Sequence, residues 1–363
     1  MCSRINKTAD VAIWGHIPPP YGGMTIHIKR LIPRLRDAGI SVQTYNLNDP
    51  EFKDPSVPNF ANKKFLWLLR LLFRRTEKIH YVISVRPFIR FVAVLFGKIK
   101  RKKVILRIGG ASLYKSIYGT SGVLKYFSLF SLRNADAVIG VNKSICDLAI
   151  SIGVKPQNVY HVPGFIPPNE NEGYVPDKVI RFLNNKSPKL LVTGTLPSDE
   201  EYDVYGIKDA IKVLSRLKNH FPHAGLLVYV QNAEKSDNTS FDAVQNIIKG
   251  LKANSSVLLY ASSDELFPVF KHVDLFLRPS YSDGDANSIR EAIYCGLPVV
   301  ASDCVIRPEC VMTFRTGNIE SFSEVLTEVI RNINHHKNKT KLNVMTDNSF
   351  KIIEIIKDLL KRQ

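Results

Sequence analysis

Two carboxylates lie eight residues apart in a polar stretch of the second half of the chain, Asp283 and Glu291. Carboxylates can accept hydrogen bonds from sugar hydroxyls, and the first backbone amides of a helix can bind phosphate oxygens. If both side chains flank a helix start, the stretch suits a ligand that carries a diphosphate and sugar hydroxyls, such as a nucleotide sugar. The alternative is structural: Asp283 would make a turn, and Glu291 would compensate the helix dipole.

The residues around this pair predict one strand, loop, helix and strand unit. A buried strand is expected over 273–278 and a helix over 287–295, and the next strand starts at Val299. Asn287 is a residue type that favours the N-cap position, and Gly296 terminates the helix. Between them, Asp283 and Gly284 form a turn signal. A parallel strand that enters a helix through a polar loop leaves the helix amides at the carboxyl ends of the strands, where ligands bind. The loop is therefore a candidate anion site.

The same residues resemble the signature of glycosyltransferase family 4. Asp283-Gly284-Asp285-Ala286-Asn287-Ser288-Ile289-Arg290-Glu291-Ala292 is followed by Gly296-Leu297-Pro298-Val299-Val300-Ala301-Ser302-Asp303. In that family two glutamates separated by seven residues precede a Gly-x-Pro-Val strand, and here the first carboxylate is an aspartate, one methylene shorter. The resemblance implies a retaining glycosyltransferase that uses a nucleotide diphosphate sugar, expected to be a UDP-sugar, with no bound metal and no other cofactor. It also implies that Asp283 contacts the donor sugar and Glu291 the ribose.

The resemblance implies a donor-binding set in the second half of the chain. Its members are Gly194, Arg278, Asp283, Gly284, Ala286, Asn287, Ser288, Ile289, Glu291 and Arg307. Family members usually hold the diphosphate with an Arg and a Lys, but Thr195 and Tyr205 stand at those positions. The usual pair of basic residues that holds the diphosphate is therefore absent at these two positions. Arg278 and Arg307, at predicted strand ends, are expected to supply the positive charge, since a guanidinium matches phosphate oxygens well.

The N-terminal segment predicts a strand over 11–15, a glycine loop, and a helix that ends before Gly39. The loop contains the pair Gly22-Gly23, which does not fit the Gly-x-Gly-x-x-Gly pattern of dinucleotide-binding folds. By the resemblance this pair approaches the acceptor and the donor phosphates, and Gly23 joins Asp283 and Glu291 in the catalytic centre. A tight turn that only glycine can make is the alternative.

A second glycine pair, Gly109-Gly110, follows a predicted strand over 103–108. Many relatives have a histidine in this region that touches the transferred sugar, and none stands there in this sequence. The candidates for that role are Ser112, Arg107 and His16. The expected acceptor-binding set is Gly22, Gly23, Gly109, Gly110, Ser112 and His16.

Both halves of the 363-residue chain alternate strand and helix patterns, which indicates an α/β protein with two doubly wound domains. The expected organisation is an N-terminal acceptor-binding Rossmann-like domain over 1–175 and a nucleotide-sugar-binding Rossmann-like domain over 186–340. A polar connector over 335–347 is expected to lead to a helix over 348–363 that returns to the first domain. The resemblance names this arrangement GT-B, with a central cleft between the domains.

The net charge of +17 is concentrated in residues 63–103, where Glu77 opposes thirteen lysines and arginines. The apolar block within 65–73 is shorter than the roughly 20 residues that cross a bilayer. A helix over 63–75 could instead lie in an anionic membrane surface, with Trp67 below the headgroups. The alternative is a core helix with a solvated basic edge, and for 87–97 that alternative is favoured. Aliphatic side chains between the bases, without a recognised module, argue against nucleic acid.

The remaining signals concern the compartment and the acceptor. The five cysteines are scattered and the N-terminus lacks the apolar region of a signal peptide, so a cytoplasmic protein is expected. The basic apolar segments of the first domain, together with the resemblance, imply a position at the inner face of the plasma membrane. By analogy, the acceptor is a polyprenyl-diphosphate-linked saccharide in bacterial surface polysaccharide assembly, such as O-antigen or capsule. A nucleotide-sugar hydrolase or epimerase on the same scaffold is one alternative. A basic protein that binds nucleic acid or membrane is another.

Overall fold

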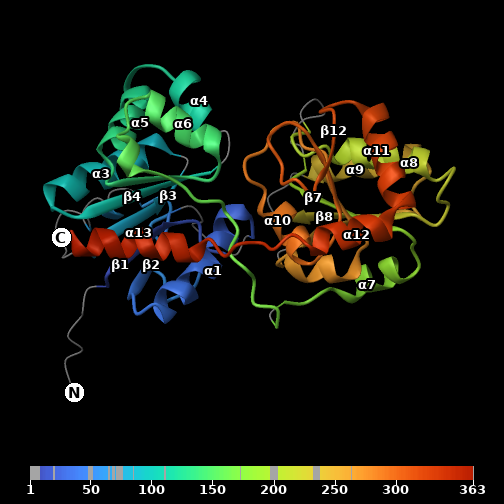
Figure 1. Ribbon diagram of the computed structural model, residues 1–363, viewed down its shortest axis with the longest axis horizontal. Coiled ribbons are helices and arrows are strands. Elements are labelled where there is room, and N and C mark those ends of the chain that lie inside the picture. The colour runs from blue at the N-terminus through green and yellow to red at the C-terminus, as the bar shows by residue number, and fades with distance from the viewer. Residues whose placement is uncertain are drawn as a thin grey trace. The chain divides into compact units, whose positions relative to one another are not determined.

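The chain forms two compact units in the computed structural model (Figure 1). The first unit comprises Met1–Ile166 and Asp347–Gln363, and the second comprises Pro167–Thr346. The structure describes residues 9–18, 21–47, 52–63, 66–67, 70, 77–84, 86–109, 112–171, 173–196, 203–231, 238–262 and 264–362. Gly110 and most of the predicted membrane helix over 63–75 therefore lie outside the described residues.

Six parallel strands form the sheet of the first unit, in the order β2-β1-β3-β4-β5-β6. They are β1 (Val11–Gly15), β2 (Val42–Asn46), β3 (Ile79–Ile83), β4 (Lys103–Ile108), β5 (Ala137–Gly140) and β6 (Val159–His161). Their nearly continuous apolar runs suit a sheet that is covered on both faces. The chain proceeds outward in opposite directions from β1 and β3, which places the topological switch point of this sheet between them.

Helices cover both faces of the first sheet. One face is covered by α3 (Pro87–Ile99), α4 (Ser112–Tyr118), α5 (Gly122–Asn134) and α6 (Lys143–Ser151), and the other by α1 (Gly23–Asp37) and α13 (Ser349–Lys361) (Figure 1). The C-terminal helix contributes Ile352, Ile356 and Leu359 to the same core cluster as Leu31 of α1. The last segment of the chain is thus part of the first unit. The helix expected over 87–97 is an ordinary packing helix, as predicted.

Trp67 corrects the expected orientation of the basic segment. We predicted that its indole would lie in a membrane surface, but the side chain is 3% exposed and belongs to the core cluster of the first unit. Its ring lies 6.0 Å from that of Trp14, in an edge-on arrangement. A large aromatic side chain contributes more stability when it is buried in a close-packed core. The amphipathic pattern of the sequence cannot show whether the apolar side faces a core or a membrane. Its neighbour Leu66 is 52% exposed.

A buried histidine makes the first unit sensitive to acid. Trp14 Nε1 donates to His80 Nδ1 at 2.9 Å, and burial, with smaller effects of Lys102 and Arg70, lowers the pKa of His80 to about 4. Because this folded-state pKa lies below the ordinary value of 6.5, the stability that depends on neutral His80 is present above pH 6.5 and is lost as the pH falls toward 4.

We expect the His80→Gln variant, which keeps a hydrogen-bond acceptor but does not titrate, to lose less stability than wild type between pH 7 and pH 5. The difference should be about 2 kcal/mol. Urea unfolding followed by tryptophan fluorescence measures it in the first unit alone, because both tryptophans of the chain, Trp14 and Trp67, lie in that core. Parallel pH dependences for the two proteins would contradict the prediction.

The second unit also has a sheet of six parallel strands, in the order β12-β11-β10-β7-β8-β9. They are β7 (Lys189–Gly194), β8 (Gly225–Gln231), β9 (Val257–Ser262), β10 (Leu275–Arg278), β11 (Val299–Ser302) and β12 (Met312–Phe314). Here the switch point lies between β7 and β10, because the chain runs outward from each of them in turn. Leu277 of β10 pairs in register with Val192 of β7.

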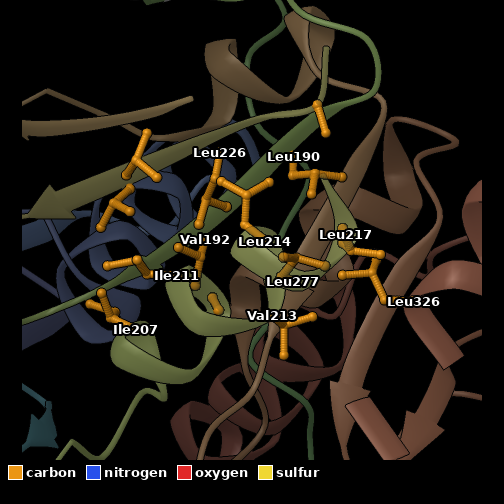
Figure 2. Packing of buried hydrophobic residues seen from close by; sticks show 14 of the residues in the cluster. Leu190, Val192, Ile207, Ile211, Val213, Leu214, Leu217, Leu226, Leu277 and Leu326 are labelled. Carbon is orange, nitrogen blue, oxygen red and sulfur yellow. The ribbon is translucent and has the colours of Figure 1, made fainter. Parts of the chain in front are cut away.

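One face of this second sheet is covered by α8 (Ile207–Leu217), α9 (Asn238–Gly250) and α11 (Ile319–Arg331). Figure 2 shows how Leu214 and Leu217 of α8 pack near Leu190, Leu226 and Leu277 of the strands. The other face is covered by α7 (Asp177–Asn184), the short helix η3 (Phe267–His272) and α10 (Asn287–Tyr294). The two parallel sheets with helices on both faces confirm the predicted fold of two Rossmann-like domains.

The segment 335–347 contains a helix that the sequence did not predict. The helix α12 (Ile333–Lys341) occupies most of what was expected to be a polar connector. It buries only His336 and Thr340, so its sequence lacks the apolar period that identifies a helix. Among the described helices, none is both long enough and apolar enough to cross a membrane.

Candidate functional site

The site in the second unit lies at the carboxyl ends of β7 and β10, at the switch point of the sheet. Strand β10 ends at Arg278 and α10 begins at Asn287, close to the predicted bounds. Its N-cap is Ala286 and not Asn287, because the amide of Ile289 already bonds to the carbonyl of Ala286 at 3.0 Å. The start of a helix favours an anion, because the first backbone amides point outward along the helix axis and carry the positive end of its dipole.

Asp283, in the loop between β10 and α10, is held by two arginines. Arg278 donates to its two oxygens from Nε at 3.1 Å and from Nη2 at 3.3 Å. Arg307, from the loop after β11, donates from Nη1 to Oδ2 at 3.0 Å. The amide of Gly284 donates to Oδ1 at 3.0 Å. Four donors therefore occupy this carboxylate, which is a clustered ion pair and not the open carboxylate that the sequence suggested.

The cluster of Asp283 with its two arginines carries a net positive charge. Burial works to raise the pKa of Asp283, but the charges and hydrogen bonds of Arg278 and Arg307 prevail and lower that pKa to about 2. Asp283 is therefore anionic at all ordinary pH values and is a poor proton acceptor. Two guanidinium groups and one carboxylate leave the Arg278–Asp283–Arg307 cluster with a net charge of +1. Beside the start of α10, this charge favours an anionic ligand.

Arg278 is fixed by more than its ion pair. Its Nη1 donates to the carbonyl of Thr193 at 3.2 Å, and its guanidinium lies over the ring of Tyr205, 4.7 Å from the centroid. Tyr205 stands where relatives usually have a lysine, so an aromatic ring here supports an arginine from β10. A Cβ atom at Gly194 would lie 2.5 Å from Cγ of the Tyr205 ring. Gly194 is thus explained by the packing of Tyr205.

The loop that carries Tyr205 packs tightly on the loop after β10. Gly206 has a φ of +67°, and a Cβ atom there would lie 2.1 Å from the carbonyl oxygen of Pro279. The amide of Tyr281 donates to the carbonyl of Val204 at 2.9 Å. At the start of α8, Asp203 Oδ2 accepts a hydrogen bond from the amide of Lys208 at 2.7 Å. Residues 203–206 and the loop after β10 therefore pack closely against each other.

Arg307 also has its donors occupied. Its Nε donates to the carbonyl of Ser302 at 3.1 Å, and its Nη2 to the sulfur of Cys304 at 3.5 Å. In this structure neither predicted diphosphate cation is an open fork, because the buried carboxylate of Asp283 draws both arginines inward. Arg290 likewise pairs with Asp285, at 2.6 Å. The positive charge is present, but its donors are directed at protein atoms.

The other predicted donor residues lie together on the same loop and helix. Gly284 and Ala286 lie in the loop, and Asn287, Ser288 and Ile289 form the first turn of α10. Glu291 follows on the second turn and is 1% exposed, beside the buried Ala292 and Ile293. Glu291 therefore lies deeper in the unit than the sequence suggested. Among the described residues, no cluster of three or more His, Cys, Asp or Glu side chains could hold a metal.

The predicted acceptor residues lie in the first unit, around the switch point of its sheet. His16 directly follows β1 and is half-buried, Gly22 is the N-cap of α1, and Gly23 is its first residue. A Cβ atom at Gly22 would meet no atom of the described residues within 4 Å. Gly109 follows β4, and a Cβ atom there would touch Val141 alone among the described residues, at 4.0 Å. Packing within the described chain does not require either glycine, so both positions have room for a ligand.

Sequence reasoning missed a buried polar group near this loop. His27 of α1 lies between the carbonyl of Gly164, 3.1 Å from Nδ1, and the hydroxyl of Tyr81, 3.3 Å from Nε2. Burial, with the charges of Arg107 and Arg30, lowers its pKa well below 6.5. Arg107 donates to the carbonyls of residues 162 and 163 at 3.3 and 3.2 Å, so it positions backbone and is not open to a sugar. Ser112 begins α4.

Comparison with known proteins gives two kinds of match. Residues 187–332 match the family described as "Glycosyl transferases group 1". No curated protein sequence matches the chain significantly. Solved structures match over almost the whole chain, with low sequence identity.

Three of these structures illustrate the similarity. Anabaena Alr3699/HepE in complex with UDP-glucose has a TM-score of 0.74 at 14% identity, over 97% of this chain and 100% of that one. A glycosyltransferase from Rickettsia africae ESF-5 has a TM-score of 0.70 at 14% identity, over 98% and 100%. WaaG, a glycosyltransferase involved in lipopolysaccharide biosynthesis, has a TM-score of 0.69 at 15% identity, over 95% and 99%. Residues 187–332 thus match the group 1 glycosyltransferase family, and the chain as a whole has the GT-B fold of these structures.

Proposed function

We propose that the chain is a retaining glycosyltransferase that transfers a sugar from a UDP-sugar to a hydroxyl of a saccharide acceptor. The observation that carries the proposal is the site at the switch point of the second sheet. There the start of α10 and the net positive Arg278–Asp283–Arg307 cluster lie at the carboxyl ends of β7 and β10. This arrangement suits a diphosphate, and the match of residues 187–332 to the group 1 family supports its use for glycosyl transfer.

The choice of uridine rests on the structural relatives. Alr3699/HepE holds UDP-glucose, and its fold matches nearly the whole of this chain. In the proposed binding mode the diphosphate lies at the amides of α10, and Glu291 accepts hydrogen bonds from the ribose. The Arg278–Asp283–Arg307 cluster supplies a fixed positive charge near the diphosphate. It replaces the usual Arg and Lys, whose positions are occupied by Thr195 and Tyr205. Developing charge on the leaving diphosphate is stabilised by the same groups. No step calls for a bound metal.

The acceptor part of the proposal is a lipid-linked saccharide, polyprenyl-diphosphate-linked, in bacterial surface polysaccharide assembly. It places the protein in the cytoplasm, peripheral to the inner face of the plasma membrane. Support comes from the basic composition of the first unit and from the likeness to WaaG, which is involved in lipopolysaccharide biosynthesis. The glycines at 22 and 109, which packing among the described residues does not require, give an acceptor room to approach the first unit.

Calorimetric titration tests the donor. UDP, GDP and ADP, each with its glucose derivative, are titrated into the full chain, and we expect micromolar binding of the uridine compounds and at least tenfold weaker binding of the others. NMR of the product then reads the anomeric configuration, which is retained if the proposal holds. Absence of binding by every nucleotide would overturn the donor assignment. Consumption of UDP-sugar at full rate without acceptor would favour the hydrolase or epimerase alternative.

A further inference from the structure

The first unit exposes an apolar surface that packing does not explain. Tyr114 and Tyr118 of α4 are 55% and 64% exposed, and Val123, Leu124 and Tyr126 of α5 are 65%, 49% and 58% exposed. We refer to these five side chains as the α4–α5 surface. In Figure 1 the two helices lie together above the sheet of the first unit. Single exposed apolar residues are normal, but a group of them marks an interaction site.

The fold holds these side chains outward. In α4 the opposite side is buried, with Leu113 at 0% and Ile117 at 2% exposure. Buried Arg90 of α3 donates to the hydroxyl of Ser116 at 3.4 Å, which ties α4 to its neighbour. Tyr114 and Tyr118 therefore cannot turn into the core. Their rings lie 5.5 Å apart.

The first turns of α5 project in the same way. Every residue from 121 to 126 is exposed, and burial begins only at Ser128. Behind the exposed turns the ring of Phe127 stacks on Phe91 of α3, with centroids 4.2 Å apart, and Tyr126 lies 6.3 Å from the same Phe91 ring. The exposed tyrosine thus stands on a rigid aromatic base. Exposed apolar side chains on a rigid base are typical of a surface that binds a partner.

The positive charge around the α4–α5 surface favours an anionic partner. Between Lys78 and Ala135 the sequence has no Asp or Glu, and exposed Lys115 and Lys125 lie among the apolar residues of α4 and α5. Tyrosine rings favour the boundary between lipid headgroups and acyl chains, and lysines beside them attract anionic headgroups. Val123 and Leu124 give the surface aliphatic tips that can enter the acyl region.

We propose that the α4–α5 surface docks the first unit on an anionic lipid bilayer. This assigns membrane contact to residues 114–126, whereas Trp67, which was expected to enter the membrane surface, is buried in the core. The biological meaning of the contact rests on the proposed lipid-linked acceptor. The surface itself is argued without the donor site, so the two proposals can fail separately.

Vesicle binding tests the surface in the absence of donor and acceptor. The full chain is sedimented with phosphatidylcholine vesicles, with and without phosphatidylglycerol. We expect binding that requires the anionic lipid and weakens at high salt. In Tyr118→Ser/Leu124→Ser the partition coefficient should fall by on the order of tenfold, and in Lys115→Gln/Lys125→Gln by on the order of 10- to 30-fold. Unchanged fluorescence of the buried tryptophans shows that the variants are folded.

Matched controls separate this surface from general stickiness and charge. Phe350→Ser removes a 71% exposed aromatic from α13 of the same unit, and Lys98→Gln/Lys100→Gln removes two exposed bases from the end of α3. Both should retain wild-type binding within about twofold, as an interface confined to the surface requires. The proposal is overturned if wild type does not bind anionic vesicles, or if a control weakens binding as much as its matched surface variant.

A fluorescent substitution locates the contact directly. Because both native tryptophans are buried, a Tyr118→Trp variant reports from the surface, and Tyr174→Trp, at a 60% exposed tyrosine of the second unit, is its control. Anionic vesicles should shift the emission of the first variant to shorter wavelengths and leave the second unchanged. Equal shifts in the two variants, or no shift in either, would contradict docking through α4 and α5.

Discussion

The Asp283→Asn variant is expected to lose about 3–5 kcal/mol of the stability of the second unit. The substitution keeps the shape of the side chain but removes the charge that holds Arg278 and Arg307. Both guanidinium groups are almost fully buried, with side-chain exposures of 9% and 3%. Removal of one partner from a buried ion pair leaves uncompensated charge, which costs more than the pair contributed. The loss should therefore greatly exceed that of an exposed pair.

Calorimetric unfolding measures this loss, and the tryptophans provide an internal reference. Because Trp14 and Trp67 belong to the first unit, their fluorescence transition should stay unchanged while the calorimetric transition of the second unit moves to lower temperature. The matched control is Glu320→Gln, which breaks an exposed pair with Arg216 and should shift the transition of the second unit far less. Equal effects of the two substitutions would show that the Asp283 cluster is not a buried charge network.

The same cluster predicts a dependence on acid. The folded-state pKa of Asp283, about 2, lies below its ordinary value of 3.8. The stability that it contributes is therefore present above pH 3.8 and is lost as the pH falls toward 2. The shift of about 2 units corresponds to roughly 2–3 kcal/mol. This contribution is smaller than the cost of Asp283→Asn, because linkage counts only the protonation of one group. In the variant, this part of the acid dependence should be absent.

The strand, loop and helix of the site could be predicted because their signals are local. The predicted strand over 273–278 and helix over 287–295 agree with β10 and α10 to within two residues at each end. An apolar run, a turn pair and a terminating Gly296 are read from neighbours along the chain. The exact N-cap could not be read, since Asn287 has the right chemistry but Ala286 has the right backbone.

The pairing of Asp283 with Arg307 could not be predicted, because it depends on the sheet. The two residues are brought together only when β10 and β11 lie side by side, with Arg278 in register with Ala301. Tyr205 reaches Arg278 from the loop after β7, on the other side of β10. Sequence reasoning found the right residue types at strand ends. It could not show that the cations would face a protein carboxylate.

Dependence on the whole fold also explains why the predicted membrane contact of the first unit moved from the segment over 63–75 to the α4–α5 surface. An amphipathic basic segment has the same pattern whether its apolar side meets a core or a membrane. Trp67 meets the core. Residues 114–126 contain two charged side chains, Lys115 and Lys125, so the charge pattern did not identify this segment. Its apolar side chains nevertheless stay exposed once the helices pack. Burial, which depends on the whole fold, distinguishes the two cases.

The Glu291→Gln variant is expected to bind the nucleotide-sugar donor about 10- to 150-fold more weakly than wild type, equivalent to roughly 1.5–3 kcal/mol for a hydrogen bond to a charged group. This prediction rests on the proposed binding mode, in which the carboxylate accepts from ribose hydroxyls. Glutamine keeps the volume of a side chain that is 1% exposed, so the variant avoids the cavity that alanine would leave beside Ala292 and Ile293.

Calorimetric titration of the preferred donor measures the change, and Glu324→Gln, at an exposed position of α11, is the matched control. The control should bind as wild type does. If Glu291→Gln lowered the stability of the second unit but left donor affinity unchanged, its carboxylate would serve the fold alone, and ribose recognition would have to come from elsewhere. If affinity fell without a loss of stability, the buried carboxylate would be kept for the ligand, since a charge at such depth has a desolvation cost that the fold could avoid with an apolar residue.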